Sequence, residues 1–554
     1  MHTEKRVIAI STVVVAVMLA VIWWKCPICF QNNDDRTLMY FTAGYMTGHK
    51  EIGSVFGGFL WYGLIAFFYK IYDGIAWYTV LQLAAIAVSL ICICSAYMKA
   101  AKKQWYLGIV TFAIILITIM FHFVTALQYT VSAGIIGAAA VCLYYLSLKE
   151  DDVYNIWIVL SAVALVLSYE MRKQMGFVAL SGLCIVAFTH FWSNRKRVIK
   201  TGIALILLFA AAFVSNTVYE NITGVADFNK YYKSAGTWND YPHLSYEGNE
   251  DVYEAVGWDD TLFDLAEDWY FMDENVTIEN FDKLNETYGD GGVTFNDRVQ
   301  KAKDIIKSNM MSNIQTGMLI FVIFVGNILV IIKKKADKRL ACADLLTAMF
   351  IVASAYFLLK GRFPLRVYQA LIYVYLIPAV MMLLDALADM EQLPFKLAYP
   401  VLLAIMPFLL CNKFPEANVV KYTYAVCNDV NRAKDISQAK SLDRYAIANH
   451  KNFYVYDFDL SLPVDPFLTY TDVMPNNLAL WGGWQYNTPE YWNQLEENDF
   501  SDGFYSKDFL QDNVCFCTRE LPEKFVNYIT KRHPGAEFKQ VDECDGIKIY
   551  SIRE

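Results

Sequence analysis

Apolar residues are arranged along this chain in long runs that short polar segments interrupt. Most runs approach the ~20 residues that an α-helix needs to cross a bilayer core. A spanning backbone in lipid must be helical or form a closed barrel, and the alternation of a membrane barrel is absent. The pattern predicts an all-α polytopic membrane bundle of about eleven transmembrane helices, near residues 7–24, 75–97, 105–121, 126–147, 153–169, 176–192, 201–218, 314–332, 341–359, 367–385 and 397–412.

Three basic clusters separate predicted spans and determine the expected orientation. Lysine and arginine concentrate in cytoplasmic loops, and the predicted spans place all three clusters on one side. The N-terminus is therefore predicted inside and the C-terminal region outside. The clusters are Lys99/Lys102/Lys103, Arg195/Lys196/Arg197/Lys200 and Lys333/Lys334/Lys335/Lys338/Arg339.

One apolar run, residues 52–71, conflicts with this orientation if it crosses the membrane, because every later loop then changes side. Its glycines and many aromatic residues suit a helix lying in the outer interface, where aromatic rings favour the headgroup level. An interfacial helix is the preferred interpretation, and an ordinary span is the alternative.

The polar segments define two predicted domains. Residues 1–412 form the transmembrane domain, with outside loops at 25–74 and 219–313, and residues 413–554 form an extracytoplasmic α/β domain. In this tail, short apolar runs predict strands and amphipathic stretches predict helices. The strand-like runs are 453–457, 514–517 and 547–552, and the helix candidates are 489–497 and 521–532.

Composition narrows the class of partners. The net charge is −9, and the loop between Tyr219 and Lys307 is strongly acidic, which argues against a nucleic-acid surface. The sequence Cys26-Pro-Ile-Cys29 has the spacing of half a zinc site or of a redox pair. No matching second ligand pair follows, so a disulfide outside the membrane is favoured over a metal site. The connectivity of such a disulfide cannot be read from the sequence.

Candidate catalytic residues follow the first predicted span. Asp34 and Asp35 lie in Gln31-Asn-Asn-Asp-Asp-Arg36 at the expected membrane surface. A carboxylate there can serve as general base for an acceptor hydroxyl, and the pair can also bind a divalent cation. The alternative is that both residues cap the helix that begins near Arg36.

Candidate substrate-binding residues occur in two turns that are predicted to lie outside. Both turns are basic, whereas lysine and arginine generally concentrate in cytoplasmic loops. Arg172 and Lys173 lie in the first turn, and Arg362 and Arg366 in the second. Arginine suits bidentate contacts to phosphate, so these turns can hold the phosphate of a lipid carrier. The alternative is snorkelling towards lipid headgroups. His49 lies near the same face and joins the substrate-binding candidates.

Together these features resemble the GT-C class of membrane glycosyltransferases: an acidic pair in the first outside loop, interfacial helices, many spans, arginine-bearing outside turns and a C-terminal α/β domain. Four segments also resemble uncharacterised multi-span proteins of Gram-positive bacteria, namely Asn239-Asp-Tyr-Pro242, Gly257-Trp-Asp-Asp260, Asp268-Trp-Tyr-Phe-Met-Asp-Glu274 and Leu480-Trp-Gly-Gly-Trp484.

The resemblance implies transfer of a sugar from a polyprenyl-phosphate carrier to an extracytoplasmic acceptor, expected to be a cell-surface glycan. It gives Asp34 or Asp35 the role of base or metal ligand. A flippase or transporter of lipid-linked sugars is the alternative outside enzymology, although no internal repeat of the transporter kind is evident. A polymerase or ligase of surface glycans is the nearer alternative in chemistry.

Overall fold

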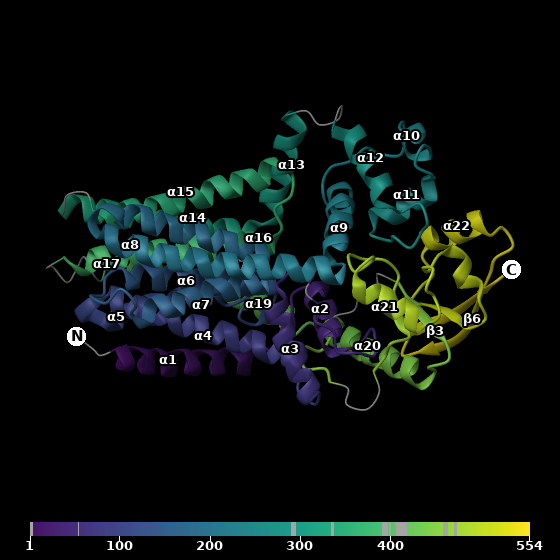
Figure 1. Cartoon of the computed structure of the whole chain (residues 1–554), viewed down its shortest axis with the longest axis horizontal. Coiled ribbons are helices and arrows are strands. Elements are labelled where there is room, and N and C mark those ends of the chain that lie inside the picture. The colour runs from purple at the N-terminus through teal and green to yellow at the C-terminus, as the bar shows by residue number, and fades with distance from the viewer. Residues whose placement is uncertain are drawn as a thin grey trace.

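The computed structural model describes residues 4–53, 55–289, 295–333, 337–390, 397, 400–405, 418–457, 464–469 and 474–554. A bundle of long helices forms one part of the molecule, and the C-terminal sheet lies beyond one end of it (Figure 1). The chain begins at the opposite end of the bundle. The segments after α1, after α8 and after residue 418 all emerge at the end that faces the sheet.

Within the described residues, eight helical segments are long and apolar enough to cross a membrane, so the chain is a multi-pass membrane protein. They are α1 (Glu4–Lys25), α4 (Trp77–Ala100), α5 (Trp105–Ile115) with its flanking turns, α6 (Tyr129–Ser147), α8 (Lys173–Thr223), α14 (Met310–Lys333), α15 (Lys338–Leu359), and α16 (Leu365–Leu371) continuing into α17 (Ile377–Ala388).

The predicted number of spans differs from this count for identifiable reasons. Two predicted spans, 176–192 and 201–218, are the two arms of α8, which bends at Asn194 where the backbone leaves the helical region. The predicted span 153–169 is α7 (Ile156–Met171), an apolar helix of 16 residues. The last predicted span, 397–412, lies mostly outside the described residues. The number of crossings therefore stays a prediction.

The centre of the bundle is formed by α6 and the α16–α17 segment, whose apolar windows are completely buried. Small residues allow this close approach, because a side chain added at Gly134 would come within 2.8 Å of Ala370. The N-terminal ends of both helices consequently lie together. This places Tyr129 and Arg366 beside each other in one cavity at the end of the bundle that faces the C-terminal sheet.

The basic clusters meet at the other end. One cavity there is lined by residues of all three clusters, including Lys102, Arg195, Arg197, Lys338 and Arg339. The sequence prediction that the clusters share one side is therefore confirmed. Which compartment that side faces remains a prediction from the distribution of charge.

Among the described residues of the range 52–71 there is one short helix, α3 (Phe59–Ile71), of 13 residues. It lies across the end of the bundle (Figure 1). One face is buried through Tyr62, Ile65 and Tyr69, whereas Leu64 and Phe67 on another face are exposed. A helix of this length and exposure fits the predicted interfacial position.

The tail forms a five-stranded sheet of order β4-β3-β5-β7-β6. Parallel pairing joins β3 (Phe453–Tyr456) to β4 (Leu478–Leu480) and β5 (Val514–Thr518), and β7 (Ile547–Arg553) adds antiparallel to β5 and β6 (Glu537–Cys544). Helices α20 (Val430–Ala448), α21 (Pro489–Glu497) and α22 (Glu523–Arg532) accompany it, whereas α19 (Val419–Cys427) lies against the end of the bundle (Figure 1). The sheet confirms the predicted C-terminal α/β architecture.

The long outer segment packs against this sheet. It contains α9 (Val225–Asp240), α10 (Glu250–Glu254), α11 (Asp260–Glu267), α12 (Ile278–Gly289) and α13 (Phe295–Ser308). Trp238, Trp258 and Phe281 of this segment belong to the same hydrophobic cluster as Trp481 and Phe516 of the tail. Burial of this shared apolar surface stabilises the contact between the α9–α13 segment and the tail. The two therefore meet the bundle as one packed unit.

Candidate active site

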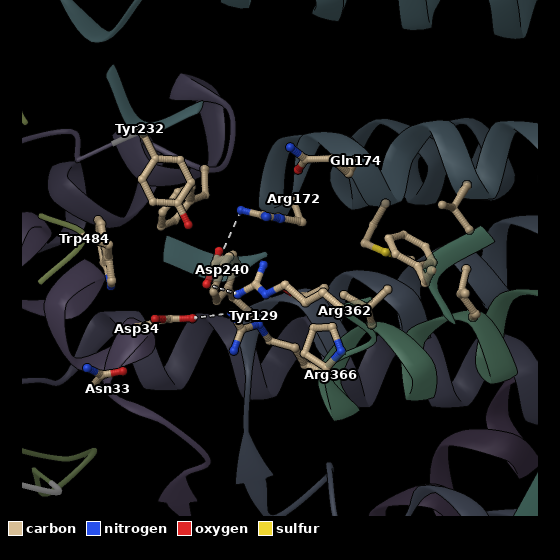
Figure 2. A pocket seen from close by; sticks show the side chains of 18 of the residues that line it. Asn33, Asp34, Tyr129, Arg172, Gln174, Tyr232, Asp240, Arg362, Arg366 and Trp484 are labelled. Carbon is tan, nitrogen blue, oxygen red and sulfur yellow. Dashed lines mark hydrogen bonds and ion pairs between the residues drawn. The ribbon is translucent and has the colours of Figure 1, made fainter. Parts of the chain in front are cut away.

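A cavity of about 340 Å³ lies where the bundle meets the outer segments. Its wall combines residues from six places in the chain: the start of α2 (Asn33–Ala43), the loop before α3, the ends of bundle helices, the α9 region, the segment after α11 and the turn after β4. Figure 2 shows the polar side chains that converge there. Of the sequence-predicted site residues, Asp34, Arg172, Arg362 and Arg366 line this cavity.

Asp34 lies in the first turn of α2 and faces the cavity. The side chain of Asn32 donates a hydrogen bond of 3.0 Å to its carboxylate. Asn32 is the N-cap of α2, so neither Asp34 nor Asp35 is the capping residue. The interpretation of the pair as simple helix caps is therefore wrong.

Asp35 points the other way, into the bundle, and is fully buried. Its carboxyl group accepts hydrogen bonds from the Tyr78 hydroxyl at 2.9 Å and from the Tyr129 backbone N–H at 3.0 Å. Burial raises the pKa of Asp35 to about 8, and the neighbouring Asp34 carboxylate acts in the same direction. Asp35 thus supports the strand-to-helix corner at Tyr129 and does not reach the cavity.

Three arginines approach the cavity from two turns of the bundle. Arg172 forms the corner between α7 and α8, where its guanidinium donates to the Tyr129 hydroxyl at 3.1 Å. Arg362 and Arg366 flank the start of α16. The turn before α16 contains Gly361, whose φ of 79° suits glycine, and Pro364, which is the N-cap of α16.

The carboxylates in the cavity pair with two of these arginines. Arg362 contacts Asp240, the last residue of α9, at 2.8 Å, and Arg366 approaches Asp34 at 3.7 Å. Burial raises the pKa of Asp240, against the opposing effect of both arginines. All three guanidinium groups therefore turn towards the protein interior, and snorkelling into lipid headgroups does not describe them.

Aromatic rings cover the cavity opposite the arginines (Figure 2). The Phe56 ring lies 4.6 Å from Trp484 and 5.2 Å from Tyr232, measured between centroids. Trp269 extends this group from Tyr232 at 6.2 Å. The indole of Trp484 is 9% exposed, and its N–H has no hydrogen-bond partner among the described residues. A buried indole N–H usually has a partner, so this donor has unused hydrogen-bonding capacity in a residue that lines the cavity.

The backbone around Trp484 is held by a close contact with the outer segment. The Gly483 N–H donates to the Trp269 carbonyl at 2.6 Å. Gly482 has φ of 94°, and a side chain there would lie 2.3 Å from the same carbonyl. Only glycine satisfies both requirements, which explains the Gly-Gly pair inside Leu480-Trp-Gly-Gly-Trp484.

The remaining wall of the cavity is apolar and belongs to the bundle. It is formed by Met175 and Val178 of α8, Phe357 of α15, and Val367 and Leu371 of α16. These helices are among the candidate membrane spans. One part of the cavity is therefore lined by arginine and aromatic side chains, and the other part by apolar side chains of candidate membrane helices. Such a lining suits an amphipathic ligand.

Two other predicted binding residues lie elsewhere. Lys173 follows Arg172 directly but forms an ion pair with Glu220 at 2.6 Å, and His49 pairs with Glu497 at 2.8 Å on the surface. Neither lines the cavity. A divalent cation shared by Asp34 and Asp35 does not fit this geometry, because the two carboxylates face apart. Across the described residues no group of three His, Cys, Asp or Glu side chains is placed to hold a metal ion.

Sequence reasoning gave no site role to four residues of this cavity that have polar or aromatic contacts, namely Phe56, Tyr129, Asp240 and Trp484. Asp240 and Trp484 occur in segments that stand out only for their resemblance, whereas Tyr232 and Trp269 belong to the loop 219–313, whose aromatic residues are expected from the sequence to cover the site and to be able to stack against a sugar. The only signals were the clustered Trp, Tyr and Gly residues of those motifs. Their convergence depends on tertiary contacts.

Comparisons with known proteins give distant structural neighbours. No family model and no curated protein matches the chain. Two crystal structures of ArnT from Cupriavidus metallidurans are similar over 97% of each chain: the form bound to undecaprenyl phosphate, with 12% identity and a TM-score of 0.42, and the apo form, with 10% identity and a TM-score of 0.40. The resemblance to proteins of Gram-positive bacteria stays a prediction.

Proposed function

We propose that this chain is a membrane glycosyltransferase of the GT-C type, which transfers a sugar from a polyprenyl-phosphate carrier to an extracytoplasmic acceptor, a cell-surface glycan. The observation that carries the proposal is the cavity itself. Three arginines converge opposite Asp34, and the wall beyond them is apolar and lies among membrane helices. A ligand that fills this space has an anionic group joined to a hydrocarbon tail.

The arginines hold the carrier phosphate. Their guanidinium groups outnumber the two carboxylates that line the cavity, and planar guanidinium groups bind phosphate oxygens in pairs. The tail then extends along Met175, Val178 and Leu371. When the bond between the sugar and the phosphate breaks, the arginines stabilise the negative charge that develops on the leaving phosphate.

Asp34 acts as the general base. It accepts the proton of the acceptor hydroxyl while that oxygen attacks the anomeric carbon, and the polyprenyl phosphate departs with the bonding electrons. The hydrogen bond from Asn32 and the nearby Arg366 orient the carboxylate. Asp35 is excluded from this step by its burial and its bonds to Tyr78 and Tyr129.

Trp484 and its aromatic neighbours contact the saccharide. The unpartnered indole N–H donates to a sugar oxygen, and the rings of Trp484 and Tyr232 pack against apolar faces of the sugar. This assigns substrate recognition partly to the C-terminal domain. It also explains why the Gly482–Gly483 turn and Trp269 are so tightly joined.

The test is a product balance in proteoliposomes. Purified protein is supplied with a radiolabelled polyprenyl-phosphate sugar and a cell-wall glycan fraction, and free polyprenyl phosphate and labelled glycan are measured. Equal amounts of both products support transfer. If the labelled carrier instead crosses the bilayer unchanged, the protein is a flippase and the transferase proposal is wrong. Failure to consume or move any carrier across a panel of sugars also contradicts it.

A further inference from the structure

Two cysteine thiols from distant parts of the sequence lie close together beside the short strand β1. Cys29 begins β1 (Cys29–Phe30), which pairs with β2 (Ala126–Leu127), and Cys427 ends α19. Their sulfur atoms lie 3.6 Å apart. A disulfide bond measures ~2.05 Å, so bonding requires the sulfurs to approach by only about 1.5 Å, within reach of side-chain rotation.

We infer that Cys29 and Cys427 are joined by a disulfide that fixes the beginning of the tail to the first outer loop. Cys29 lies shortly after α1 and Cys427 ends α19, and both helices reach the end of the bundle that faces the C-terminal sheet (Figure 1). That end is predicted to face the extracytoplasmic side, where disulfides persist. The inference is independent of the sugar-transfer proposal, because it depends on thiol geometry and compartment only.

The surroundings of the two thiols give each a distinct part in forming the bond. Cys29 is buried, and the contact with Cys427 lowers the pKa of Cys29, with the Arg432 guanidinium acting in the same direction. Arg432 is held in place by a hydrogen bond to the Phe30 carbonyl. Cys427 is partly exposed and therefore accessible to an oxidant, although the contact with Cys29 and burial raise the pKa of its thiol.

The oxidant is the active-site disulfide of an extracytoplasmic thiol oxidoreductase. A thiolate exchange first joins Cys427 to one sulfur of that disulfide. The Cys29 thiolate then attacks the Cys427 sulfur, forms the new S–S bond and releases the oxidoreductase as a dithiol. The two cysteines lose two protons and two electrons in total, and the oxidoreductase gains them.

The position of this bond connects the tail to the proposed catalytic loop. Cys29 lies shortly before Asp34, and α19 leads through α20 towards β3. A further contact at this point, between Thr423 of α19 and His122, is a single hydrogen bond of 3.1 Å. The disulfide therefore ties the domain that carries Trp484 to the loop that carries Asp34.

The experiment reads the bond directly from tryptic peptides. Intact cells are treated with N-ethylmaleimide before lysis, and the full-length protein is digested without reductant. Trypsin releases residues 26–36 and 422–432 as separate peptides, so a bond links them into one species of defined mass. Because Cys26 shares the first peptide, Cys26→Ser, Cys29→Ser and Cys427→Ser variants are analysed in parallel.

The linked species is expected in the wild type and in C26S, and it is expected to disappear in C29S, in C427S and after reduction. Complete alkylation of both Cys29 and Cys427 in the trapped wild type overturns the inference. A linked species that persists in C29S but not in C26S shows that Cys26 is the partner and also overturns it. A link that arises only when trapping is delayed until after aerobic lysis is an artefact of purification and counts against the bond.

Discussion

The carboxylate of Asp34 lies 3.7 Å from the guanidinium of Arg366, although one residue follows the first membrane helix and the other lies in the first turn of α16. This pair places a candidate base next to a candidate phosphate ligand. The distance between the two groups leaves them able to exchange partners with a substrate.

Replacing Asp34 by Asn is expected to abolish transfer while leaving the fold intact. Asn keeps the size and hydrogen-bonding capacity of the side chain but cannot accept the acceptor proton, so the rate falls by about 10²–10⁴-fold. The measurement is initial rate with the polyprenyl-phosphate sugar, alongside the apparent Tm. Asp227→Asn, at an exposed carboxylate outside the cavity, is the matched control and should retain full activity. Normal turnover by D34N means that Asp34 is not the base.

Replacing Arg366 by Gln is expected to weaken binding of the carrier. A hydrogen bond to a charged group contributes ~1.5–3 kcal/mol, which corresponds to an increase of about 10- to 100-fold in the KM for the lipid substrate. The KM of Arg366→Lys should lie between the values for the wild type and for R366Q, because lysine keeps the positive charge but cannot form two parallel hydrogen bonds to phosphate. Arg553→Gln, at an exposed ion pair of the tail, is the control. An unchanged KM in R366Q contradicts the phosphate assignment.

Replacing Trp484 by Phe is expected to lower kcat/KM by about 2- to 10-fold, because it removes one hydrogen bond of ~0.5–1.5 kcal/mol and keeps an aromatic ring. Separate titrations of carrier sugar and acceptor show which saccharide the indole contacts. Trp492→Phe, at a tryptophan that lines a different cavity, serves as the matched control. If W484F and W492F behave alike with both substrates, Trp484 has no role in recognition.

Replacing Asp35 by Asn is expected to change the pH dependence of stability without removing activity. The folded protein holds a proton on Asp35 up to about pH 8, whereas the ordinary pKa is 3.8. Between these values the native state binds a proton that the unfolded state lacks, so wild-type stability falls as the pH rises. D35N removes this loss. Its apparent Tm relative to wild type should therefore increase between about pH 5 and about pH 8, and a constant difference argues against a protonated Asp35.

The orientation is tested by cysteine labelling with a membrane-impermeant maleimide in intact cells. A cysteine introduced at Val541, an exposed position of β6, should react, and one at Lys196, in the bend of α8, should react only after the membrane is permeabilised. The unmodified protein gives the background from native thiols. The opposite pattern reverses the topology and places the cavity on the cytoplasmic side.

The helices were predictable because their signal is local. Long apolar runs in Val7–Trp24 or in α4 can satisfy their backbone in lipid only as helices, whatever else the chain does. The same reasoning found β3, β5 and β7, which are buried apolar runs. It missed β6, an edge strand rich in charged residues, because such a strand exposes most of its side chains and carries no apolar run.

By itself the sequence determined that this is a multi-span helical protein with basic clusters at one end and an acidic, aromatic outer part, and it singled out Asp34, Arg172, Arg362 and Arg366 for their chemistry. From the sequence, Asp34 and Asp35 are equally good candidates for the general base. Only the tertiary structure separated them, because successive residues of one helical turn point in different directions, one to the cavity and one to Tyr78. Asp240 and Trp484 depend on contacts between segments hundreds of residues apart, and no local pattern in a single sequence encodes such contacts.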